Sequence, residues 1–97
     1  MTVKVIGLME LTDQKAFELY RSKVSQTVEL YKGSIQNRGS VTEVFWNELN
    51  CTRFGAFVEL TFPSQEDAKA WVHSPEYQAL VAIRNEAMKL TLFAVTI

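Results

Sequence analysis

The segment RFGAFVELTF, residues 53–62, constrains the fold more than any other part of the sequence. Its apolar residues recur at every second position, a period typical of a β-strand with one face against a core. Pro63 ends this strand, because proline has no backbone N–H to donate to a neighbouring strand. One face of the strand carries Phe54, Ala56, Val58, Leu60 and Phe62, and the other carries Gly55, Phe57, Glu59 and Thr61.

A second strand is predicted at the start of the chain, over VKVIGLMEL, residues 3–11. Large apolar residues stand on both of its sides, so we expect both faces of the sheet to be at least partly buried. One side carries Val3, Val5, Met9 and Leu11, and the other carries Lys4, Ile6, Leu8 and Glu10.

A helix is predicted between Thr12 or Asp13, whose side-chain oxygens can cap its first turn, and about Tyr31. We expect Gly33 to close it in the left-handed conformation that commonly ends a helix. Its apolar stripe consists of Phe17, Tyr20, Val24, Thr27, Val28 and Tyr31.

Two more helix starts follow the strand at 53–62. Ser64 with Asp67 resembles a capping box, and a short helix is expected from there to about His73. Ser74 caps again, and Pro75 takes the first helical position, where its missing N–H has no cost. This last helix is expected to continue to about Lys89.

The remaining segments complete a strand, helix, strand, strand, helix, strand order. A strand region is predicted over 35–46, with a bulge or tight bend at 38–40, followed by a loop over 47–52 and a final strand over 90–97. In one domain of 97 residues, this order predicts an α+β, ferredoxin-like fold: a four-stranded antiparallel sheet with both helical segments on one face.

The amino-acid composition indicates that the other face of the sheet is also buried. Hydrophobic residues make up 47% of the chain and aromatic residues 11%, which is more than one small two-layer core needs. The open face would expose Ile6, Leu8, Phe57 and part of 93–95 to water. We therefore expect this face to pack against a second copy of the chain, giving a homodimer.

A nucleic acid is not expected as a partner. The formal net charge is −1, so the general attraction to phosphates is missing. RFGAFVEL, residues 53–60, resembles the central strand of RNA-recognition domains, but Gly55 stands where a base-stacking aromatic is needed. Lys4 stands where the first strand of those domains has its own stacking aromatic.

The location expected for the chain is the cytoplasm. Cys51 is the only cysteine, so no internal disulfide can form, and this favours a reducing compartment. The segment MTVKVIGLMEL, residues 1–11, lacks the features of a secretory signal. No apolar run approaches the roughly 18 residues that span a bilayer, so no membrane association is expected.

The block 61–84 combines a Phe-Pro-Ser start, a capped helix with a tryptophan, and Ser-Pro-Glu-Tyr-Gln followed by an arginine. This combination resembles the family catalogued as domain of unknown function 1330. The Arg38–Gly39 turn and the helix end at Tyr31 and Gly33 also match, although Ser40 replaces a second glycine. Within the block, the matching positions are Phe62, Pro63, Ser64, Ala68, Trp71, Ser74 to Gln78 and Arg84.

This resemblance implies a ferredoxin-like fold that dimerises sheet to sheet, the dimeric α+β barrel. Relatives at the superfamily level include lactone isomerases, cofactor-free monooxygenases and haem enzymes, so whether the chain is an enzyme stays open. The family usually has an acid immediately before Phe-Pro-Ser, where this chain has Thr61. Glu59 lies two residues earlier on the same strand face and is a candidate for a displaced catalytic carboxylate.

Arg84 is the most informative candidate site residue, because it falls in the middle of the apolar stripe of the last helix. A buried guanidinium needs a partner, and its planar fork suits a carboxylate. One interpretation is an internal pair with an acid such as Glu59, or a buried stem with its charge in water. The other is that Arg84 binds a small organic anion.

The predicted pocket for that anion lies between helices and sheet, lined by Tyr20, Trp71, Tyr77 and Met88. The two tyrosines are also explained as packing residues with satisfied hydroxyls. Arg38 either adds a positive charge at the pocket mouth or is a solvated turn residue. The alternative to anion binding is a non-catalytic dimerisation module in which Arg84 is structural.

His73, the only histidine, is the remaining catalytic candidate. It is either a general base or a surface residue that interacts with helix C-terminal carbonyls. One histidine and one distant cysteine give no metal-ligand spacing, so no metal site is predicted. No phosphate-binding loop or nucleophile motif occurs either, and no cofactor is expected.

Overall fold

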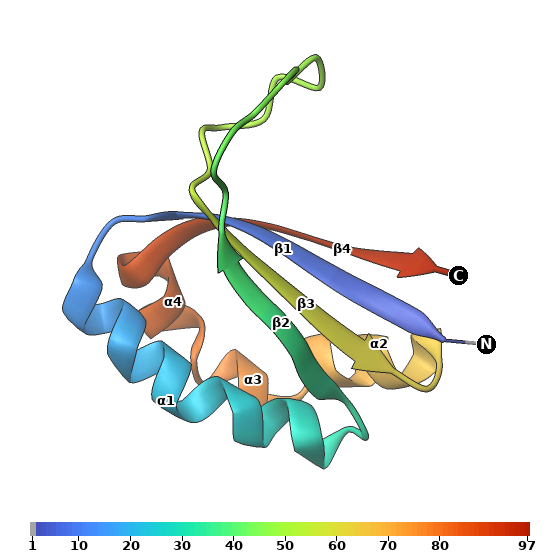
Figure 1. Ribbon diagram of the computed structural model, residues 1–97. Coiled ribbons are helices and arrows are strands. Elements are labelled where there is room, and N and C mark those ends of the chain that lie inside the picture. The colour runs from blue at the N-terminus through green and yellow to red at the C-terminus, as the bar shows by residue number, and fades with distance from the viewer. Residues whose placement is uncertain (1) are drawn as a thin grey trace.

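The structure, a computed structural model, describes residues 2–97. Its strands form one antiparallel sheet in the order β2-β3-β1-β4, and its helices all lie on one face of that sheet (Figure 1). The predicted α+β, ferredoxin-like fold is confirmed. The strands are β1 (Val3–Leu11), β2 (Ser34–Ser40), β3 (Ala56–Phe62) and β4 (Met88–Thr96), and the helices are α1 (Gln14–Leu30), α2 (Gln65–Val72), α3 (Pro75–Gln78) and α4 (Val81–Ala87).

The hydrophobic core lies between the helices and the sheet. Burial alternates along β1, where Val3, Val5 and Met9 face the helices, as the two-residue period predicts. The largest fully buried side chains come from α1, β3, α2 and α3: Val28, Phe62, Trp71 and Tyr77. None of the helices in residues 2–97 combines the length and the apolar character needed to cross a bilayer.

The three predicted helix starts are confirmed. Asp13 Oδ1 accepts from the Ala16 N–H at 2.9 Å and begins α1. Ser64 Oγ accepts from the Asp67 N–H at 3.2 Å and begins α2. Ser74 Oγ accepts from the Tyr77 N–H at 3.0 Å and begins α3. Each cap satisfies a backbone donor that would otherwise have no partner in the first turn.

The last helical segment differs from the prediction, because it is two helices rather than one. The chain turns between α3 and α4, where the Leu80 N–H bonds to the Tyr77 carbonyl, three residues earlier, at 2.8 Å. The segment also ends at Ala87, since Lys89 already belongs to β4. The apolar periodicity continues through the turn, so the sequence gives no sign of it.

The end of α1 also differs from the prediction. Lys32, not Gly33, takes the left-handed conformation, with φ of 71°. Gly33 is needed for space instead, because a Cβ placed on it would lie 2.5–2.8 Å from the ring of Phe62. The glycine therefore allows the buried ring to pack directly against the end of the helix.

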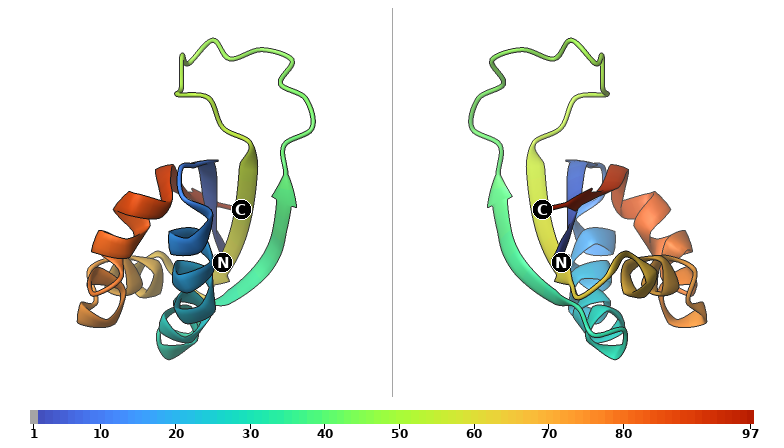
Figure 2. Two further views of the ribbon diagram at one scale, coloured as in Figure 1. Left: turned by 90° about the vertical axis from the view of Figure 1, so that its left-hand side faces the viewer. Right: turned by 90° about the vertical axis from the view of Figure 1, so that its right-hand side faces the viewer.

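The predicted strand region 35–46 is confirmed over residues 35–40, which belong to β2, and is wrong over residues 41–46. Strand β2 ends at Ser40, opposite Ala56, and the register shift lies between Ile35 and Asn37 rather than at Gly39. Residues 41–55 form a long loop that projects from the sheet (Figures 1 and 2). The β-propensity of this segment does not extend the strand, because β3, the strand beside β2 in the sheet, begins at Ala56.

The face of the sheet opposite the helices is open (Figure 2), and apolar side chains lie on it among polar and charged ones. On β1 and β4 it carries Ile6 paired with Phe93, which is 44% exposed. Lys4 and Glu59 form an ion pair on the same face at 3.3 Å. Leu8, Phe57 and Val95 complete the apolar part of this face.

Candidate functional site

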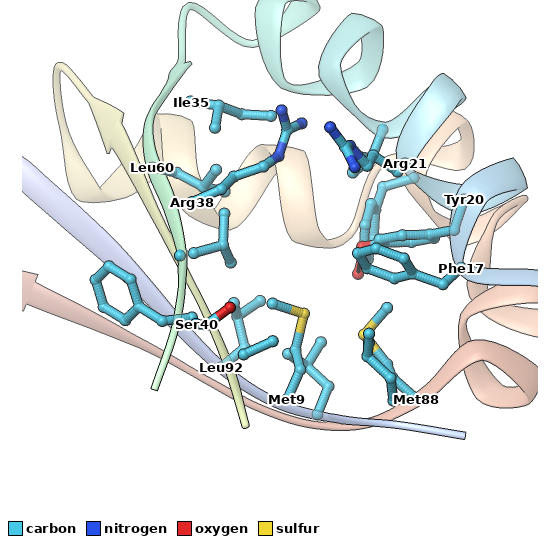
Figure 3. Close-up of a pocket in the computed structure, with 18 of the residues that line it drawn as sticks. Met9, Phe17, Tyr20, Arg21, Ile35, Arg38, Ser40, Leu60, Met88 and Leu92 are labelled. Carbon is cyan, nitrogen blue, oxygen red and sulfur yellow. Dashed lines mark hydrogen bonds between the residues drawn. The ribbon is translucent and has the colours of Figure 1, made fainter. Parts of the chain in front are cut away.

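A cavity of about 320 Å³ lies between α1 and the helix-facing side of the sheet (Figure 3). Of its lining residues, Arg21, Arg38 and Ser40 are exposed and mark its mouth. A cavity of this size, with an apolar wall and few polar groups, is typical of small-molecule sites. The apolar wall is formed largely by Met9, Phe17, Val24, Ile35, Leu60 and Met88.

Two aromatic side chains form the inner part of the wall. The rings of Trp71 and Tyr77 lie 4.5 Å apart between centroids, and both side chains are almost completely buried. Trp71 Nε1 donates to Thr27 Oγ1 at 3.0 Å, and that hydroxyl donates to the Val24 carbonyl at 2.7 Å. These bonds connect α2 to α1 and fix the orientation of the indole ring beside the cavity.

Two tyrosine hydroxyls supply the buried polar atoms of the cavity. Tyr20 Oη and Tyr77 Oη lie 2.9 Å apart, within hydrogen-bonding distance. Arg84 Nη1 donates to Tyr77 Oη at 2.9 Å, and its guanidinium carbon lies 5.7 Å from the centre of the Tyr77 ring. Burial, reinforced by the neighbouring Tyr77, raises the pKa of Tyr20 well above its ordinary value. The Tyr20 hydroxyl therefore stays protonated near neutral pH.

Two arginines stand side by side at the mouth of the cavity, Arg21 on α1 and Arg38 on β2 (Figure 3). Arg38 Nη2 donates to Ser25 Oγ at 3.3 Å. Within residues 2–97, the one ion pair joins Lys4 to Glu59 on the opposite face of the sheet, so no carboxylate neutralises either arginine. The mouth is therefore positively charged.

The structure brings most of the predicted pocket residues together. Tyr20, Trp71, Tyr77, Met88 and Arg38 all line this cavity, although they come from five different elements or their junctions.

Arg84 does not line the cavity and meets no carboxylate among the described residues. It lies half-buried behind Tyr77, and its observed side-chain partner is the Tyr77 hydroxyl. The internal pair suggested with Glu59 is absent, because Glu59 points to the other face of the sheet.

The sequence interpretation did not include Arg21. This residue directly follows Tyr20, at the edge of the predicted apolar stripe, and this position is the only sequence signal for it. Arg21 becomes a candidate site residue because Arg38, on a strand 17 residues further along the chain, lies at the same cavity mouth.

The two catalytic candidates do not lie at the cavity. Glu59 Oε1 accepts from Asn37 Nδ2 at 3.0 Å, and this bond, followed by contact with Lys4, lowers the pKa of Glu59. His73 is exposed at the C-terminal end of α2, outside the cavity wall.

The comparisons with known proteins assign a family. The model of a protein family described as domain of unknown function, DUF1330, matches residues 3–97. The chain belongs to the DUF1330 family. The resemblance expected from the 61–84 block is thus confirmed. Among curated proteins, no match to this DUF1330 chain is found.

Solved structures similar to this DUF1330 protein share its fold at low sequence identity. A protein of unknown function from Rhodopseudomonas palustris has a TM-score of 0.78 and 14% identity, over 97% of this chain and 80% of its own. A dimeric ferredoxin-like protein of unknown function from Thermobifida fusca has a TM-score of 0.64 and 14% sequence identity. The alignment covers 100% of this chain and 92% of that one.

A third similar structure is SnoaB, a cofactor-independent oxygenase from Streptomyces nogalater. Its TM-score is 0.69 at 8% identity, and the alignment covers 99% of this chain and 92% of that one. At these identities the similarity shows a shared fold alone.

Proposed function

We propose that the cavity binds a small organic anion with an apolar body, and that the anionic group lies at the mouth beside Arg21 and Arg38. The observation that carries this proposal is the pair of unneutralised guanidinium groups at the entrance of an apolar cavity. Two converging guanidiniums suit a carboxylate, because their N–H groups match its two oxygens. The apolar wall favours an aromatic or branched aliphatic body.

The charge in this proposal comes from Arg21 and Arg38, and Arg84 has a supporting role. Arg84 donates to Tyr77 Oη and holds that ring against the cavity. Arg21 and Arg38 are exposed, so their attraction for an anion is moderated by solvent and weakens as ionic strength rises.

The test compares two ligands with the same body, 4-isopropylbenzoate and its neutral amide, 4-isopropylbenzamide. Trp71 lines the cavity and Trp46 lies on the exposed loop, so a Trp46→Phe background makes Trp71 the only tryptophan reporter. We expect the benzoate to bind more tightly than the amide. The Arg21→Gln/Arg38→Gln double variant should weaken benzoate binding roughly 3- to 10-fold and leave amide binding unchanged.

A matched control removes two positive charges elsewhere. Lys23→Gln/Lys69→Gln changes two exposed lysines that do not line the cavity, and benzoate binding should remain as in the parent protein. Equal binding of benzoate and amide, unaffected by the arginine changes, would overturn the proposal.

The internal bond of Arg84 favours a second candidate function, a non-catalytic dimerisation module. In this case Arg84 serves only to fix Tyr77 and Tyr20 in the core. The same titrations distinguish the two candidates, since the module predicts no binding of either ligand by the parent protein.

We further propose that the chain forms a homodimer through the open sheet face and functions in the cytoplasm. Two features support the homodimer: the apolar residues of that face, and the description of similar structures as dimeric. The free thiol of Cys51 supports a reducing compartment.

A further inference from the structure

Three side chains form a hydrogen-bonded series that ends at the cavity. Arg84 Nη1 donates to Tyr77 Oη at 2.9 Å, and Tyr77 Oη lies 2.9 Å from Tyr20 Oη. Arg84 lies outside the cavity wall, whereas the two tyrosines belong to it. The series therefore leads from a charged group behind the wall to the hydroxyl of Tyr20, a residue that lines the cavity.

The two tyrosine hydroxyls carry two hydrogens, but only one of these hydrogens is used in a bond within the series. Each tyrosine hydroxyl carries one hydrogen, and arginine is a donor only. The bond between the two tyrosines uses one phenolic hydrogen, and the Tyr77 oxygen accepts from Arg84. Among residues 2–97, neither hydroxyl has any further acceptor within hydrogen-bonding distance. One phenolic hydrogen is left without a protein partner.

The charge of Arg84 favours one of the two possible arrangements of this bond. Tyr77 Oη accepts a bond from a guanidinium, so it becomes a better donor and a poorer acceptor for its next bond. The 2.9 Å distance allows either oxygen to be the donor; the bond from Arg84 favours Tyr77 as the donor, and in that arrangement the Tyr20 hydrogen is the free one. Tyr20 is 8% exposed, so an unpaired donor there is costly unless a molecule in the cavity accepts from it.

We propose that Tyr20 is a specificity-determining residue whose hydroxyl donates to a carbonyl or phenolate oxygen of the ligand, at the inner end of the cavity. This inference rests on the proposed function and refines its ligand class. The ligand then has two polar ends: an anionic group beside Arg21 and Arg38, and an oxygen acceptor beside Tyr20. Oxo- or acyl-substituted aromatic carboxylates belong to this class.

Tyr20 remains a donor over the working pH range, because burial holds its pKa well above the ordinary value. A ligand hydroxyl at this point can also accept from Tyr20, because its oxygen carries lone pairs. A ligand with a methyl group there would leave the Tyr20 hydrogen unpaired.

The experiment compares 4-acetylbenzoate with 4-isopropylbenzoate, which have similar shape and the same carboxylate but differ in one carbonyl oxygen. The two also differ in hydration, so the diagnostic quantity is the change in their affinity ratio on Tyr20→Phe. We expect this substitution to lower the preference for 4-acetylbenzoate about fivefold. Isopropylbenzoate affinity should change little.

Two further variants make the result specific. Tyr77→Phe keeps the Tyr20 hydroxyl and should lower the affinity ratio by less than Tyr20→Phe does. Tyr31→Phe removes a hydroxyl whose partner is Glu76, away from the cavity, and should leave the ratio unchanged.

The outcomes separate this inference from the proposed function. An unchanged ratio in Tyr20→Phe, with both ligands bound, overturns the role of Tyr20 and leaves anion binding intact. The role of Tyr20 is also overturned if the ratio of the two affinities falls in Tyr77→Phe and stays unchanged in Tyr20→Phe. If the parent protein binds neither ligand, the proposed function fails and this inference fails with it.

Discussion

Replacement of Gly33 by alanine adds only one methyl group, yet it should lower the stability of the fold markedly. A Cβ at this position would lie 2.5–2.8 Å from the ring of Phe62, which is fully buried and cannot move aside. We expect Gly33→Ala to lower the free energy of unfolding by about 1–3 kcal/mol, as overpacking of a core does. Urea denaturation followed by circular dichroism measures it.

The neighbouring position supplies the control at the same scale. Lys32 holds the left-handed conformation, so Lys32→Gly should leave stability unchanged or raise it. If Gly33→Ala were neutral while Lys32→Gly was destabilising, the steric account of Gly33 would be wrong.

At the scale of elements, the loop over residues 41–55 is the part of the chain that contributes least to the core. Three of its large apolar side chains are strongly exposed: Phe45 at 75%, Trp46 at 81% and Leu49 at 90%. We expect limited digestion with chymotrypsin to cut first within this loop, because exposed loops are preferred sites of proteolysis. Mass spectrometry of the early products locates the cut.

The two fragments should remain associated after this cut, because β2 and β3 stay hydrogen-bonded in the sheet. A variant with serine at 45, 46 and 49 should resist the same enzyme concentration. A first cut outside residues 41–55 would contradict the exposure of the loop.

For the whole molecule, the open sheet face leads to a prediction about assembly. Phe93 lies on this face, pairs with Ile6 across the strands and is 44% exposed. In the proposed sheet-to-sheet dimer a charge introduced there would be buried, so Phe93→Glu should convert that dimer largely to monomer. Sedimentation velocity measures the change.

The control for assembly is Leu30→Glu, which places the same charge on an apolar residue of α1 that is 65% exposed and not on the sheet. This variant should sediment like the parent protein. A parent protein that is monomeric throughout, or a Phe93→Glu variant that remains dimeric, would exclude the open face as the interface.

The sequence by itself determined the features that depend on neighbouring residues. Period-two and helical patterns identified the element types, and Asp13, Ser64 and Ser74 began their helices because each cap needs only the next turn of chain. The apolar residues of the open face followed from the same alternation. These features together were sufficient for the fold and for five residues of the cavity lining: Tyr20, Arg38, Trp71, Tyr77 and Met88.

The tertiary structure alone decided the features that depend on which distant residues meet. It ended β2 at Ser40, because no strand lies opposite residues 41–46, and it placed Arg21 beside Arg38. It also gave Arg84 a tyrosine hydroxyl rather than a carboxylate. A local pattern specifies the face on which a side chain lies, but the partner it meets there depends on the packing of the whole chain.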